Sequence, residues 1–115
     1  MHLKLIAVIT RTHLTERIIL AAKRAGATGA TIVPARGTGL SETRSFLGLS
    51  LDSQRDLLLF LLEESQVLAV TKAIHAEGEL DNPGTGMLFV LDVEQAMGLK
   101  EQLACFETEI HEQYN

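Results

Sequence analysis

The apolar segments of this chain follow one another in an order that repeats. An aliphatic stretch over residues 2–9 is followed by a segment with apolar residues at helical spacing, and then by a second aliphatic stretch over residues 31–36. The same succession returns with an aliphatic run at 57–62, a helical pattern at 65–78 and a last aliphatic run at 87–91. Because strands and amphipathic helices differ in the period of their apolar residues, this order predicts two βαβ halves.

Two such halves in one chain favour an α+β fold of the ferredoxin-like βαββαβ type, whose four strands form a sheet in the order 4-1-3-2. The first helix is predicted over residues 14–25. Pro34 indicates that the second strand lies at a sheet edge, because proline cannot donate a ladder hydrogen bond. A short helical turn over 94–97 and a further amphipathic helix over 99–113 are expected to follow.

No linker or change in composition divides the chain, so we expect a single domain, 1–115, with a core spanning 2–93. Ten lysine and arginine residues against fifteen acidic residues give a net charge of −5, which disfavours a nucleic-acid-binding role. The longest apolar run, Leu57–Leu62, is far shorter than the ~20 residues of a membrane span. Since no signal peptide is evident and Cys105 is the single cysteine, we expect a cytoplasmic protein.

The first, third and fourth predicted strands are apolar at consecutive positions rather than at alternate ones. Such strands require burial on both faces of the sheet. The two helices between the strands cover one face, and the C-terminal helix is too small to cover the whole of the other. The sequence therefore predicts an oligomer in which the sheets of neighbouring subunits pack against each other.

Two triplets have the same sequence. Gly37-Thr38-Gly39 follows the second strand, and Gly84-Thr85-Gly86 precedes the fourth. Glycines let a backbone approach a ligand closely and successive N–H groups can bind an anion, although ordinary glycine turns have the same composition. In the 4-1-3-2 sheet both triplets lie at one end but on opposite edges, three strand spacings or roughly 14 Å apart. A nucleotide cleft between two subunits is the hypothesis that fits this separation.

The segment 37–52 is long for a connection in a small domain, where about four to six residues are usual. It carries the apolar residues Phe46, Leu47 and Leu49 among polar ones. This composition is typical either of a loop that docks on a partner or of one that folds back on its own domain.

Four residues near the end of the second helix, His75, Glu77, Glu79 and Asp81, have side chains that can bind a divalent cation. A solvated acidic helix end is the simpler interpretation, and no metal site is assigned. The sequence has no nucleophile elbow, zinc-ligand spacing or Ser/His/Asp grouping, so an enzyme is not predicted.

Two segments carry a recognisable pattern. Residues 29–39 have the sequence GATIVPARGTG, and residues 84–93 have the sequence GTGMLFVLDV. They resemble the G-x-T-V-x-x-x-x-G-x-G and G-x-G-K-I-F-V-x-x-V segments of the PII signalling superfamily, small trimeric proteins with a ferredoxin-like fold. The resemblance runs from about Leu3 to Leu99 and includes the order of the elements and the lengths of the loops.

The resemblance implies a homotrimer that binds ATP, ADP or AMP, optionally with Mg²⁺, in clefts between subunits. The residues implied to line the nucleotide site are Gly29, Thr31, Gly37, Thr38, Gly39, Arg55, Leu61, Gly84, Thr85, Gly86 and Lys100. It also implies that residues 37–52 form a T-loop that docks on a membrane transporter or an enzyme, and so recruits the protein to the membrane. The residues implied in docking are Arg44, Phe46, Leu47 and Leu49.

The chain departs from the family pattern at positions that contact phosphate in the family. Met87 replaces the lysine after the glycine triplet, and Gly98-Leu99-Lys100 replaces an R-x-R motif. The T-loop has no tyrosine, so uridylylation is not expected. The chain is thus predicted to be a divergent PII-like regulator rather than a standard nitrogen regulator. The alternatives are a CutA-like metal-responsive trimer and a PII-like protein that has lost nucleotide binding.

Overall fold

The computed structural model describes residues 2–37, 45–46, 49–50 and 53–98. Its elements, in chain order, are β1 (Leu3–Arg11), η1 (Thr12–Leu14), α1 (Thr15–Arg24), β2 (Thr31–Gly37), β3 (Ser45–Phe46), β4 (Leu49–Ser50), β5 (Ser53–Glu63), η3 (Glu64–Gln66), α2 (Val67–Glu77) and β6 (Gly86–Asp92). None of the described helices is long and apolar enough to cross a membrane.

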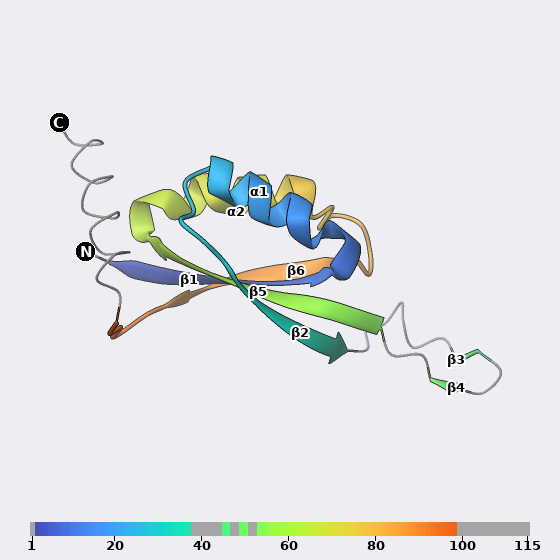
Figure 1. Ribbon diagram of the computed structural model, residues 1–115. Helices are drawn as coiled ribbons and strands as arrows, with labels where there is room; N and C mark the ends of the chain where they lie inside the picture. The colour runs from blue at the N-terminus through green and yellow to red at the C-terminus, as the bar shows by residue number, and fades with distance from the viewer. Residues whose placement is uncertain (1, 38–44, 47–48, 51–52, 99–115) are drawn as a thin grey trace.

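The main sheet has four strands in the order β2-β5-β1-β6, and every neighbouring pair is antiparallel. Helices α1 and α2 lie together on one face of this sheet (Figure 1). This is the ferredoxin-like α+β arrangement, and the observed strand order confirms the one predicted from the sequence. Pro34 lies in the edge strand β2, as expected from its missing N–H group.

The hydrophobic core fills the space between the helices and the sheet. Strands contribute alternate residues to it, because successive side chains point to opposite faces. The register of β1 and β5 pairs Ile6 with Phe60 and Val8 with Leu58, and all four side chains are fully buried. The helices complete the core with the buried side chains of Leu14, Ile18, Ala22, Val70 and Ile74.

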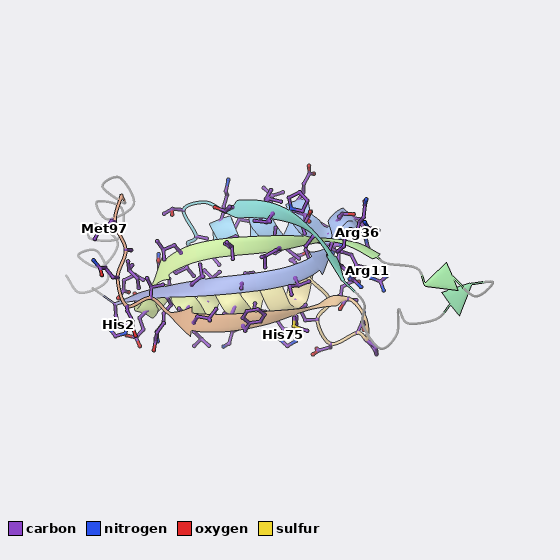
Figure 2. All side chains as sticks on the ribbon, turned by 90° about the horizontal axis from the view of Figure 1, so that it is seen from below. His2, Arg11, Arg36, His75 and Met97 are labelled. Atoms are coloured by element: carbon purple, nitrogen blue, oxygen red, sulfur yellow. The ribbon has the colours of Figure 1, made fainter. Side chains whose placement is uncertain are left out.

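The opposite face of the sheet is apolar and no described element covers it (Figures 1 and 2). The residues that point to this face alternate with the core residues in the strands. On β6 they are Met87, Phe89 and Leu91, whose side chains are 57%, 41% and 44% exposed. We call this surface the open face. It accounts for the consecutive apolar residues of the sequence, and the oligomer that would cover it remains a prediction.

Strand β5 begins at Ser53, four residues before the predicted start at Leu57. Polar residues occupy these positions, so the apolar pattern did not reveal the strand. They are accommodated because they pair with β2 at the end of the sheet, where Gly37 lies opposite Ser53. The long loop is shortened accordingly, and it contains a small antiparallel hairpin in which Phe46 lies opposite Leu49.

The helical turn predicted over residues 94–97 is not present, and Gly98 follows with a left-handed φ of 81°. Four residues are too few to nucleate a helix on their own, since the first turn fixes several dihedral angles for a single hydrogen bond. The predicted helix 99–113 lies outside the described residues.

Glu63 ends β5 and caps the helical segment that follows. Its carboxylate accepts hydrogen bonds from the backbone N–H and the hydroxyl of Ser65, while the side chain of Gln66 accepts from the Glu63 N–H. This reciprocal arrangement is a capping box. The Gln66 amide also donates to the carbonyl of Gly26, at 3.2 Å, and thereby connects the two halves of the chain.

We expect Glu63→Gln to destabilise the protein by about 1 kcal/mol at pH 7 and by less in acid. Burial works to raise the pKa of Glu63, but the hydrogen bonds from Ser65 and those with the backbone of His2 and Glu64 together outweigh it and hold the pKa below its usual value. The carboxylate therefore stabilises the fold above pH 4.5, and this contribution is lost as the pH falls through the pKa of the folded state. Urea unfolding at a series of pH values measures the difference, with Glu64→Gln as the exposed neighbouring control.

Candidate functional site

The ends of four strand segments meet at one end of the sheet. Strand β2 ends at Gly37 opposite Ser53, and β1 ends at Arg11 opposite Arg55. Strand β6 begins at the same end, where Gly86 lies opposite Thr10. In Figure 2, Arg11 and Arg36 lie at this end, and His2 and Met97 lie at the other. We call it the loop end, because both glycine triplets and the 37–52 segment adjoin it.

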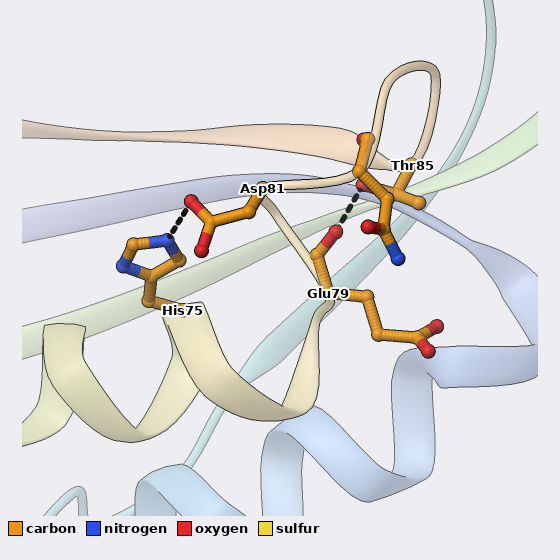
Figure 3. A network of polar contacts seen from close by, with 5 residues as sticks. His75, Glu79, Asp81 and Thr85 are labelled. Atoms are coloured by element: carbon orange, nitrogen blue, oxygen red, sulfur yellow. Dashed lines mark hydrogen bonds and ion pairs between the residues drawn. The ribbon is translucent and has the colours of Figure 1, made fainter.

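The loop before β6 is held by the hydroxyl of Thr85. This hydroxyl lies 2.7 Å from the carbonyl oxygen of Glu79 and 2.8 Å from that of Asn82, and it donates into the loop (Figure 3). Thr85 is buried, with 8% of its surface exposed. The threonine of the second triplet therefore fixes the shape of the turn through its side chain.

Gly86 is required by the packing of β6 against β1. Its φ of 156° lies in a region that favours glycine, and a Cβ atom would lie 2.0 Å from the carbonyl oxygen of Ile9. Gly84 has a φ of 77°. In contrast, a Cβ atom on Gly37 would meet no atom within 4 Å. The described part of the chain thus explains Gly86 but offers no steric reason for the glycine at position 37.

Arg55 reaches from β5 to this turn. Its terminal nitrogens donate to the carbonyl oxygens of Gly84, at 3.0 Å, and Thr85, at 3.1 Å. The side chain is 7% exposed. Burial lowers the pKa of Arg55 from its ordinary value, and the positive charge of Arg11 lowers that pKa further. Arg55, which the family resemblance assigns to nucleotide binding, thus binds the backbone of the glycine turn.

Arg11 contacts the same turn from β1 and was not anticipated from the sequence. Its Nε donates to the Gly84 carbonyl oxygen, at 3.1 Å. An arginine after an aliphatic strand has no distinctive local pattern. Its position becomes meaningful only when the register places it directly opposite Arg55 and beside the turn.

A cavity of about 520 Å³ opens at the loop end between β2, β5 and the start of η1. The residues that line it are Thr12, Pro34, Ala35, Arg36, Gln54, Arg55 and Asp56. The Asp56 carboxylate accepts a hydrogen bond from the Thr15 hydroxyl at 2.6 Å, which orients it towards the start of α1. The cavity brings charged groups of both signs next to the base of the 37–52 segment.

Three of the predicted nucleotide-site residues lie elsewhere. Thr31 begins β2, about 20 Å along the strand from Gly37, and Gly29 precedes the strand. Leu61 pairs with Leu5 on the open face and is half-buried. One subunit therefore does not bring these residues together with the glycine turn before β6.

The remaining predicted residues fall on parts of the chain that the structure does not describe in full. Thr38, Gly39, Arg44, Leu47 and Lys100 lie outside the described residues. For Phe46 and Leu49 only the backbone is described, as the pair that joins β3 to β4.

The candidate metal-binding residues near the end of α2 do not converge. His75 Nε2 lies 2.7 Å from an Asp81 carboxylate oxygen, but Glu77 forms an ion pair with Arg17 on α1, at 3.2 Å. The carboxylate of Glu79 points away from the His75–Asp81 pair (Figure 3). Within the described ranges, no three His, Cys, Asp or Glu side chains are grouped so that they could hold a metal ion.

Glu79 adopts a left-handed backbone conformation, with a φ of 53°, directly after the end of α2. A side chain costs free energy in this region, and glycine is the usual residue at such a position. We therefore expect Glu79→Gly to stabilise the protein by up to about 1 kcal/mol in urea unfolding. Glu79→Ala keeps the Cβ atom and is expected to raise the free energy of unfolding only slightly. If it stabilised the protein as much as Glu79→Gly does, the carboxylate and not the backbone conformation would cause the effect.

Comparison with known proteins gives a consistent result. A search of curated protein sequences found no match. Among solved structures, "Structure of B. subtilis GlnK" matches with a TM-score of 0.69 and 19% sequence identity, over 87% of this chain and 92% of that chain. The likeness to this structure is one of fold. The sequence model of the family described as "Nitrogen regulatory protein P-II" matches residues 3–102, which include both glycine triplets and the strands that carry them. The chain therefore belongs to the nitrogen regulatory protein P-II family.

Proposed function

We propose that this chain is a PII-like signal-transduction protein that has no enzymatic activity and binds an adenine nucleotide at the loop end, between subunits. Nucleotide binding would control the 37–52 segment, the T-loop, which then regulates a transporter or an enzyme. The observation that supports this most directly is the convergence of the glycine turn at Gly84–Gly86, two arginines and the base of the T-loop at one end of the sheet.

A homotrimer is the assembly that we propose. The open face offers an apolar surface across all four strands, and packing such faces together would remove them from water. A neighbouring subunit would also supply what one subunit lacks, since Gly29, Thr31 and Leu61 lie far from the glycine turn of their own chain. The proposed site is thus completed by the assembly.

Coupling between ligand and T-loop follows from the ladder at its base. The T-loop leaves β2 at Gly37 and returns at Ser53, and these two residues pair with each other. Arg55 lies two residues further along β5 and binds the glycine turn. A ligand that displaces or engages this turn would therefore act on the strand that anchors the loop, and would favour one loop arrangement over another.

A thermal-shift and calorimetric titration with ATP, ADP and AMP, with and without Mg²⁺, tests the proposal. A nucleotide at 100 times its dissociation constant should stabilise the protein by about 2.7 kcal/mol. The absence of any shift or heat with all three nucleotides would contradict the nucleotide-binding function.

Gly37 provides a variant that separates binding from folding. Because no described atom lies within 4 Å of a Cβ atom at position 37, Gly37→Val should leave the free energy of unfolding almost unchanged while it obstructs the nucleotide cleft. We expect at least a tenfold loss of nucleotide affinity. Ala76→Val, an enlargement on the exposed surface of α2, is the control and should bind as the wild type does. Equal affinities for all three proteins would place the site elsewhere.

A further inference from the structure

We infer that Arg11 is a phosphate ligand of the nucleotide site, and that its terminal guanidinium nitrogens bind a phosphate group of a nucleoside di- or triphosphate. This inference rests on the proposed function and names a residue that the sequence did not single out. Four features of the loop end support it.

The first feature is the strand register. Arg55 lies directly opposite Arg11, and Met87 on β6 lies opposite Ile9, two residues before Arg11 on the same strand. Residues directly opposite and two apart share a face of the sheet. Arg55, Arg11 and Met87 therefore form a row across three strands at the loop end, with Arg11 in the middle and diagonal to Met87.

The second feature is the set of hydrogen bonds that the glycine turn already forms. The carbonyl oxygens of Gly84 and Thr85 accept hydrogen bonds from the two arginines, and the Thr85 hydroxyl donates into its own loop. The turn thus presents carbonyl oxygens, and not N–H groups, to the row of side chains. An anion on this side of the turn needs a cationic side chain for its binding.

The third feature is the geometry of Arg11. Its Nε–H is committed to the Gly84 carbonyl oxygen, which fixes the guanidinium beside the turn. A guanidinium has five N–H groups, so four remain on the two terminal nitrogens. The side chain is exposed, and no described carboxylate forms an ion pair with it. A planar, pre-oriented guanidinium of this kind matches two oxygens of a phosphate group.

The fourth feature is the proximity of two positive charges. Arg11 lies next to the buried Arg55, and the two positive charges repel each other, as the lowered pKa of Arg55 indicates. A doubly charged phosphate between or beside them would relieve this repulsion. A neutral nucleoside would not relieve it, so the expected ligand carries phosphate.

The test is calorimetric titration of the full chain with ATP, ADP and adenosine. Arg11→Ala should weaken ATP and ADP binding on the order of 10- to 100-fold and leave adenosine binding unchanged. Arg11→Lys keeps the positive charge but loses the forked guanidinium. Its affinity for ATP and ADP should lie between the affinities of the wild type and of Arg11→Ala. Arg24→Ala removes an exposed arginine at the end of α1 and serves as the charge-matched control, with wild-type affinities.

The adenosine titration distinguishes a phosphate ligand from a structural tether. If Arg11 served only to hold the turn, its removal would weaken adenosine and ATP binding equally, which would overturn the inference.

The two proposals fail in different ways. If the wild type binds ATP and Arg11→Ala binds it as tightly, the role proposed for Arg11 is wrong, but the proposed nucleotide site is still supported. If the wild type binds neither ATP, ADP nor adenosine, the proposed function is wrong and this inference falls with it.

Discussion

Gly86→Ala is expected to destabilise the protein by about 4 kcal/mol, enough to unfold a marginally stable domain. The new Cβ atom would lie 2.0 Å from the Ile9 carbonyl oxygen and 3.1 Å from the Ile9 carbonyl carbon. Both are backbone atoms of the central strand β1, so no side chain can rotate away to make room. Strand β6 would have to move away from β1, and the pairing of Thr10 with Gly86 would be lost.

Urea unfolding followed by circular dichroism measures this effect. Gly37→Ala is the matched control, because no atom of the described residues lies within 4 Å of the added Cβ atom and the same loss of a glycine occurs at the same end of the sheet. Its stability should change by less than about 0.5 kcal/mol, or rise slightly as the unfolded chain becomes less flexible. Similar midpoints for both variants would show that β6 can shift at little cost, contrary to the expectation.

Phe89→Asp is expected to dissociate the proposed trimer while each subunit keeps its fold. Phe89 lies in the middle of β6 on the open face, opposite Ala7, and its side chain is 41% exposed in the single subunit. The hydrophobic core is on the other face, so the fold does not depend on this side chain. In an interface between open faces, however, the new carboxylate would be buried without a partner, at a cost of several kcal/mol.

Sedimentation equilibrium at several concentrations measures the outcome. A loss of about 4 kcal/mol per interface corresponds to roughly a thousandfold weaker association, so the variant should sediment with the mass of one chain. Leu68→Asp is the control: Leu68 is 65% exposed on α2, on the helical side of the molecule. If Leu68→Asp dissociates the protein and Phe89→Asp does not, the helices and not the sheets form the interface.

The order of the elements could be predicted from the sequence because the apolar period changes clearly between strands and helices. The start of β5 could not, since Gln54, Arg55 and Asp56 interrupt the apolar pattern, and only the pairing with β2 shows that they continue the strand. Similarly, Glu63 and Gln66 gave no strand or helix signal of their own. Their structural role comes from the reciprocal hydrogen bonds that they form at the start of the second helical segment.

For the site, the sequence identified the segments better than the roles of their side chains. Gly84, Thr85 and Gly86 were correctly placed at the same end of the sheet as Gly37. The family resemblance indicated Arg55, but it contained no information that this side chain crosses β1 to reach two carbonyl oxygens. Arg11 was missed altogether, because its neighbours are set by the register between strands that are about 45 residues apart in the chain.

The two edges of the sheet differ in what they offer to another polypeptide. Strand β2 is interrupted by Pro34, whereas β6 continues from Met87 to Leu91 without a proline or a charge. An unpaired edge of this composition is a template for cross-β association, which native proteins avoid by covering it. An assembly that covered this edge would therefore also protect the protein from aggregation, since subunits that meet their partners late expose a segment that can nucleate aggregates.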